Sequence, residues 1–182
     1  MNMGFVVHAD QKGPLVIFDD SKGLIEPRIT PLKNNFFCRG ALMSYHLACP
    51  TEGKFVVESP ELCSLFHQLY YSALERLHKI IAIIDLYPRN CALTEGFNLL
   101  QVLHKKQWIL NDPGISILLQ VQLFIAAGIE GPIGNDNQLL MLRCMSVSVD
   151  NLLPHSIDLE WQHAMDKWCD HAYAGHQQRI YP

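Results

Sequence analysis

The 182-residue sequence has little charge and no basic excess. Charged residues make up 18% of it, whereas an average soluble domain has about 25%. The 14 basic and 18 acidic side chains leave a net charge of −4. A protein dedicated to duplex DNA normally carries a basic excess, so this composition disfavours that class. Hydrophobic residues reach 49%, which excludes a disordered chain, a collagen and a coiled-coil rod.

The sequence also has no apolar run long enough to cross a bilayer. The longest, residues 115–129, is interrupted by Ser116, Gln120 and Gln122, whereas a membrane span needs about 20 apolar residues. Residues 1–8 lack the basic segment and apolar core of a secretory signal. The six cysteines form no Cys-x-x-Cys pair. We therefore expect six reduced thiols and a cytoplasmic location.

The first 59 residues have the pattern of short strands. Brief apolar runs are separated by turn-forming segments, and residues 41–47 show the period-two alternation of a strand. The uninterrupted run Val16-Ile17-Phe18 predicts a strand that is buried on both faces or covered by helices. We expect four or five antiparallel strands over residues 1–58.

A helix is predicted from Ser59 to about Leu86. Ser59-Pro60-Glu61 combines an N-cap residue, a proline for the first helical position and an acid near the positive end of the helix dipole. The apolar residues that follow are spaced as one buried stripe. These are Leu62, Leu65, Phe66, Leu69, Ala73, Leu77, Ile80 and Ile84.

Helical patterns continue to the end of the sequence. Residues 115–129 are apolar on nearly all sides and should form the central helix. Residues 146–149 alternate, so they predict either the end of a helix or a strand. Gly175 is expected to end the last helix. The other predicted helices are Thr94 to near Trp108, residues 138–145, and Ser156 to about Ala174.

Strand-type and helix-type patterns are therefore segregated along the chain. This predicts an α+β fold in which a small N-terminal antiparallel sheet packs on a C-terminal layer of four or five helices. We expect the β-rich residues 1–59 and the helical residues 60–182 to form one folded unit.

Two Glu-x-x-His motifs suggest a metal-dependent enzyme. Glu75 and His78 form one motif, and Glu160 and His163 form the other, with the spacing found in carboxylate-bridged di-iron bundles. On a helical wheel of about 100° per residue, both pairs face away from the apolar stripe of their helix. We therefore predict solvated faces, with no metal and no cofactor. A metal-dependent enzyme with a dispersed His/Glu site is the alternative.

Other local motifs lack the geometry that their chemistry needs. Among the C-terminal histidines, only His171 and His176 approach the spacing of a zinc-binding pair, and no second pair matches them. Cys169, Asp170 and His171 are sequence neighbours, so they point in different directions on a helix and do not form a triad. We predict no catalytic residue from these motifs.

Exposed aromatic residues favour a binding protein instead. On the predicted helical wheel, Tyr71 lies opposite the buried stripe and Tyr70 lies at its margin, and exposed aromatics are enriched among interface anchors. The segment with Lys105, Lys106 and Trp108 is the one clustered basic site, and it is small for binding a phosphate backbone. These five residues are the predicted binding residues.

The predicted function is a non-enzymatic protein–protein interaction module, such as an adaptor, an inhibitor or an assembly subunit. A low charge together with a mean hydropathy of +0.07 indicates more apolar surface than a monomer of this size needs. A protein partner or a second copy of the chain would cover it. A nucleic-acid-associated regulator is a further alternative, disfavoured by the negative charge.

Overall fold

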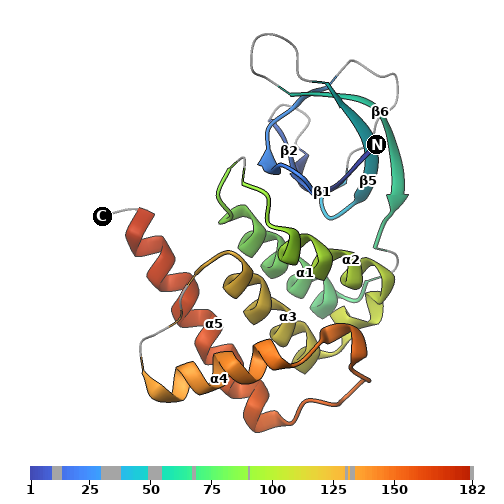
Figure 1. Cartoon of the computed structure of the whole chain (residues 1–182). Helices are drawn as coiled ribbons and strands as arrows, with labels where there is room; N and C mark the ends of the chain where they lie inside the picture. The colour runs from blue at the N-terminus through green and yellow to red at the C-terminus, as the bar shows by residue number, and fades with distance from the viewer. Residues whose placement is uncertain are drawn as a thin grey trace.

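The computed structural model confirms the α+β fold. It describes residues 1–9, 14–29, 38–48, 55–66, 69–89, 91–129, 131 and 134–180. Strands occupy the N-terminal part and helices the remainder. Figure 1 shows the sheet at one end of the molecule and the helices beside it. No helix among the described residues is long and apolar enough to cross a membrane.

In the described part of the chain, six strands form one sheet in the order β3-β2-β1-β5-β6-β4. Neighbouring strands are antiparallel except β4 and β6, which are parallel. Their bounds are β1 (Asn2–Ala9), β2 (Leu15–Asp19), β3 (Gly23–Ile25), β4 (Arg28–Ile29), β5 (Leu42–Ala48) and β6 (Val56–Ser64).

The sheet closes into a barrel, because β3 and β4 behave as one interrupted strand. Only Glu26 and Pro27 separate them, and the pair joins β2 on one side and β6 on the other. Figure 1 shows the strands curling into a ring. With β3 and β4 counted together, the first strand pairs with the second and fourth, and the third pairs in parallel with the fifth. This is a Greek-key connectivity, in which three consecutive strands are neighbours and the fourth returns to lie beside the first.

The barrel strands have two buried faces. The first face fills the barrel with Val6, Leu15, Ile17, Ile25, Ala41, Met43, Tyr45 and Val57. The opposite face joins the helical core through Phe5, Val7, Val16, Phe18, Leu24 and Leu42. The expectation that residues 16–18 are buried on both faces is therefore confirmed.

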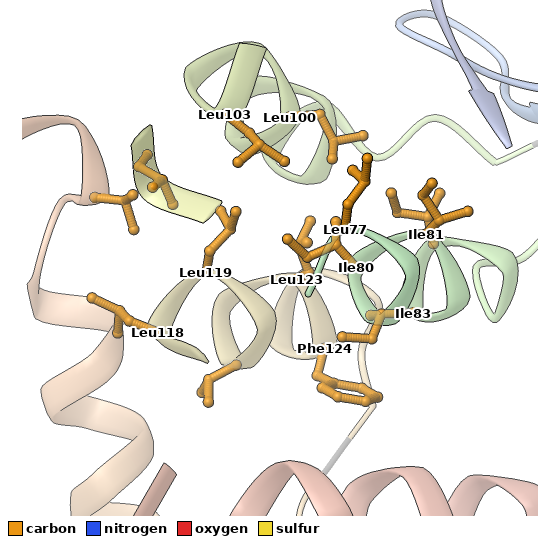
Figure 2. Close-up of a cluster of buried hydrophobic side chains, with 14 of the residues drawn as sticks. Leu77, Ile80, Ile81, Ile83, Leu100, Leu103, Leu118, Leu119, Leu123 and Phe124 are labelled. Atoms are coloured by element: carbon orange, nitrogen blue, oxygen red, sulfur yellow. The ribbon is translucent and has the colours of Figure 1, made fainter. Parts of the chain in front are cut away.

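Five helices follow the barrel in the described residues. They are α1 (Tyr71–Asp85), α2 (Thr94–Lys105), α3 (Pro113–Ala126), α4 (Asn135–Ser146) and α5 (Leu159–Ile180), with the 3-10 turns η1 (Gln107–Asn111) and η2 (Val149–Asn151). Helix α3 contacts the other four and is buried on most sides, as predicted. Figure 2 shows its Leu119, Leu123 and Phe124 packed beside side chains from α1 and α2.

The predicted helix start at Ser59 is wrong. Residues 56–64 continue the sheet as β6, and α1 begins at Tyr71. Ser59 has a φ of 48°, and the pairing of β6 with β5 shifts at this point, which is the geometry of a β-bulge. Proline is tolerated at bulges because it need not donate to the ladder. Pairing with β5 therefore overrides a local sequence signature that is typical of a helix N-terminus.

The predicted apolar stripe is correct only in its second half. Ala73, Leu77, Ile80 and Ile84 of α1 are buried. Leu62 instead lies in β6 and is 58% exposed.

The sequence leaves two alternatives open for residues 146–149, and the structure shows the end of a helix rather than a strand, since α4 continues to Ser146 and Val149 begins η2. The predicted bounds of the last helix are wrong. Helix α5 starts at Leu159 rather than Ser156, and it continues through Gly175. No atom lies within 4 Å of an added Cβ at Gly175, so nothing there forces the chain to turn.

The cysteines of the described residues are unpaired. Cys38, Cys63 and Cys91 are exposed, whereas Cys144 and Cys169 are buried. Cys49, the sixth predicted thiol, lies outside the described residues.

Gly4 is a closely packed position of the barrel strand β1. A Cβ added there would lie 2.3 Å from Ile17 Cγ2 and 2.6 Å from Tyr45 Oη. We expect Gly4→Ala to lower the free energy of unfolding by about 1–3 kcal/mol through overpacking. Gly175→Ala is the matched control in open space, and it should stabilise the helix by roughly 0.5–1 kcal/mol. Urea unfolding measures both, and equal stability of Gly4→Ala and the parent chain would contradict this packing.

Candidate functional site

Two adjacent tyrosines stand at the N-terminal end of α1. Tyr70 precedes the helix and Tyr71 is its first residue. Their exposed fractions are 77% and 78%, and Leu74, one turn further along, is 39% exposed. Residues three and four apart on a helix are surface neighbours, so these three side chains form one aromatic and apolar patch, hereafter the tyrosine surface. The predicted exposure of both tyrosines is confirmed.

The predicted basic segment does not form one patch. Lys105 is exposed. Lys106 instead binds Asp150, with Nζ 3.2 Å from the carboxylate Oδ1 and a second hydrogen bond to the backbone oxygen. Trp108 is partly buried and packs against the main core. Lys106 therefore ties the end of α2 to η2, and less positive charge remains free than the sequence suggested.

Hydrogen bonds hold η1 against the chain around the tyrosine surface. Arg76 Nη1 donates to the backbone oxygen of Leu110 at 2.8 Å. Gln107 Nε2 donates to the backbone oxygen of Leu65 at 2.8 Å. Because α1 and η1 are in contact, Trp108 lies on an element next to the one that carries Tyr70 and Tyr71.

The two Glu-x-x-His motifs lie on solvated helix faces, as the helical wheels predicted. Glu75 and His78 are exposed on α1, and Glu160 and His163 are exposed on α5. Among the described residues, no three His, Cys, Asp or Glu side chains come together as a metal-binding group.

The buried thiols are poorly suited to nucleophilic chemistry. Burial raises the pKa of the Cys144 thiol to about 11. The pKa of Cys169 is also raised, first by burial and then by the nearby carboxylates of Asp166 and Asp170. The thiolate is the reactive form of cysteine, so both side chains are protonated and unreactive near neutral pH.

A buried carboxylate organises one end of the barrel. Tyr45 Oη donates to Asp19 Oδ2 at 2.5 Å, and Asn2 Nδ2 donates to the same oxygen at 3.2 Å. The other oxygen, Oδ1, accepts the backbone N–H groups of Ser21 and Lys22 at 2.8 and 2.9 Å. Oδ1 thus holds the β2–β3 turn, and Oδ2 links the end of β2 to β1 and β5. The local sequence Asp19-Asp20-Ser21-Lys22-Gly23 is typical of a turn and does not predict this buried role.

A buried histidine joins the barrel to the helices. His104 of α2 is 7% exposed, and its Nδ1 lies 3.2 Å from Ser64 Oγ of β6. Its ring centroid is 4.4 Å from that of Phe66 and 5.5 Å from that of Phe5. Burial lowers the pKa of His104 to about 4, although the Gly40 backbone offsets part of this effect. The local sequence around His104 does not predict that its ring lies among apolar side chains from distant segments.

This histidine makes stability depend on pH. The folded pKa of about 4 lies below the unfolded value of about 6.5, so the unfolded chain binds the proton first. The contribution of neutral His104 is complete above about pH 6.5 and is lost as the pH falls towards 4, which amounts to about 2 kcal/mol between pH 7 and pH 5. Urea unfolding at these pH values should show this loss.

His104→Phe should flatten the dependence, and His163→Gln, at an exposed position, should leave it unchanged. Equal pH slopes for the parent chain and His104→Phe would contradict the assignment.

No protein-family model matches the sequence, and a search of curated proteins finds no match. Over the described residues, the chain is an α+β protein in which a barrel of five strands, with β3 and β4 counted as one, packs on a layer of five helices.

Proposed function

We propose that this protein is a non-enzymatic interaction module that binds a protein partner through the tyrosine surface. The observation that carries the proposal is the exposure of Tyr70 and Tyr71, at 77% and 78%. Each tyrosine offers a large apolar ring and a hydroxyl group, and it loses little conformational entropy on binding. Aromatic side chains of this kind are enriched at the centres of protein interfaces.

The surroundings of the tyrosines support a docking role. Leu74 extends the apolar area along α1, and the exposed Ser72 and Glu75 provide a polar margin beside it. An apolar centre with a polar rim is the usual composition of a non-obligate interface. The helix itself is anchored by its buried residues on the opposite side, so the tyrosines stand on a rigid element.

The chemistry of the buried groups supports binding rather than turnover. The carboxylate of Asp19 is occupied by structural hydrogen bonds, and burial raises the pKa of the Cys144 and Cys169 thiols. His104 is enclosed by Phe5 and Phe66. A general base or a nucleophile needs access to substrate, and none of these groups has it.

Substitution of the tyrosines tests the proposal. We expect the double variant Tyr70→Ser, Tyr71→Ser to change the free energy of unfolding by less than about 0.5 kcal/mol, because both side chains are exposed. The same variant should weaken binding to a captured partner at least about tenfold, as loss of interface anchors does. Affinity capture from the native host identifies the partner, and titration with the purified partner measures the loss.

Leu153→Ser is the matched control, because Leu153 is 74% exposed but lies outside the tyrosine surface. Unchanged partner affinity in the tyrosine double variant would refute the proposal.

Single-stranded nucleic acid is a second candidate ligand, favoured by the barrel connectivity. Barrels with this strand order bind oligonucleotides along one sheet face and through the adjoining loops, although a fold alone does not establish a function. The barrel portion, residues 1–64, has 6 basic and 7 acidic side chains, whereas residues 65–182 have 8 basic and 11 acidic. Most of the negative charge of the chain therefore lies in the helical part, and the barrel carries a net charge of −1.

Fluorescence anisotropy with a labelled single-stranded oligothymidylate tests this candidate. Binding through phosphates must weaken steeply as salt increases, because counterions are released. Anisotropy that stays flat at low salt, up to roughly 100 µM protein, would remove nucleic acid as a ligand. Partner capture that survives nuclease treatment would show separately that the protein contact is direct.

A further inference from the structure

Helix α4 carries apolar side chains on two sides. Its inward side holds the buried Cys144, with the half-buried Leu140 and Met141 packed against the core. Its outward side exposes three large apolar residues, hereafter the α4 row: Leu139, Leu142 and Met145, with exposed fractions of 66%, 62% and 60%. They follow one another at intervals of three residues and thus lie along one side of the helix.

Leu139, at one end of the α4 row, lines a cleft between α4 and α5, whereas Met145 at the other end lines a separate cleft beside α2 and α3. The cleft between α4 and α5 has a volume of about 720 Å³, and its lining includes Leu139, Leu140, Ala164 and Trp168. A recess with apolar walls beside exposed apolar side chains is suited to interdigitation with a second surface. Figure 1 shows α4 at the end of the molecule away from the barrel.

The charges that line this cleft have a self-complementary order. On α4, Asp136 precedes Arg143 by seven residues, and on α5, Glu160 precedes Lys167 by the same interval. Seven residues are nearly two helical turns, so each acid and base lie on the same side of their helix about 10 Å apart. If two copies meet antiparallel about a two-fold axis, each acid lies opposite the base of the other copy.

Arg143 is already held within its own chain. Its guanidinium lies 4.1 Å from the Trp161 ring centre and 3.8 Å from the Asp158 carboxylate. Glu160 and Lys167 are therefore the pair best placed to act between copies. The four charges on the cleft sum to zero, so the approach of two such faces meets no local repulsion even though the chain carries −4.

We propose that the α4 row and the neighbouring face of α5 form a two-fold interface with a second copy of this chain. An interface of this kind is isologous, because the same patch is used by both copies. The α4 rows pack against each other, and Glu160 of each copy lies against Lys167 of the other. The proposal does not depend on the tyrosine surface, which is on a different helix.

Sedimentation velocity from roughly 1 to roughly 500 µM tests the interface. The parent chain should pass from monomer to dimer with a dissociation constant of about 10–100 µM, since the patch is small for a permanent dimer. Leu142→Glu should raise that constant at least about tenfold, while Leu153→Glu, also exposed but outside α4, should not change it. Leu139→Ser gives the same test without an added charge, and circular dichroism verifies folding of each variant.

Charge reversal tests the two-fold arrangement itself. Glu160→Lys and Lys167→Glu should each weaken the dimer, because each places like charges opposite one another. The double variant should restore it, because the order is reversed in both copies together. A monomer at all concentrations, or a dimer insensitive to Leu142→Glu, overturns the proposal. Failure of the double variant to restore the dimer overturns the two-fold arrangement, and loss of the dimer in Tyr71→Ala assigns self-association to the tyrosine surface instead.

Discussion

The double burial of β1 and β2 is the constraint on which the rest of the structure depends. Alternate residues of these strands point into the barrel and onto the helices, so the same two strands contribute side chains to both cores. A change in register by one residue would exchange the two sets of side chains. The barrel and the helical layer therefore share these two strands, and neither core is complete without them.

Two buried polar side chains, Asp19 and His104, hold parts of this arrangement together and are not accessible as reactive groups. Asp19 closes one end of the barrel by accepting hydrogen bonds from Tyr45 and from the β2–β3 turn. His104 fills the space between β6 and α2 as a neutral ring. A buried polar group is tolerated when its hydrogen bonds are made or its charge is removed, and these two residues illustrate each solution.

Two groups of large apolar side chains are exposed to solvent in the single chain. The tyrosine surface is at the start of α1, and the α4 row is on a helix that packs mainly against α3. Because the two surfaces are on separate elements, the proposed second copy and the proposed protein partner would not compete for the same residues. Dimerisation would then present two tyrosine surfaces to one partner or assembly, which increases avidity without any new contact.

Several features of this protein are determined by local sequence. The segregated strand and helix patterns predict the α+β class, and the apolar character of residues 115–129 predicts the central helix. Asp112 and Pro113 mark where that helix begins, because the carboxylate accepts from the Ile115 N–H at 3.0 Å. The exposure of Tyr71 also follows from its angle to the buried stripe. Each of these depends on neighbours within one or two turns.

Tertiary structure decided the features that depend on distant segments. Ser59-Pro60-Glu61 is a good helix start in isolation, yet β5 recruits it into the barrel because an unpaired strand edge there would leave backbone groups without partners. His104 directly precedes Lys105 and Lys106 in the sequence, yet Phe5, Phe66 and Ser64 enclose it in the fold. The closure of the barrel by β4 and β6 joins residues nearly thirty positions apart. Local sequence determines which conformation a segment prefers, but only the packing of the whole chain determines which faces become buried.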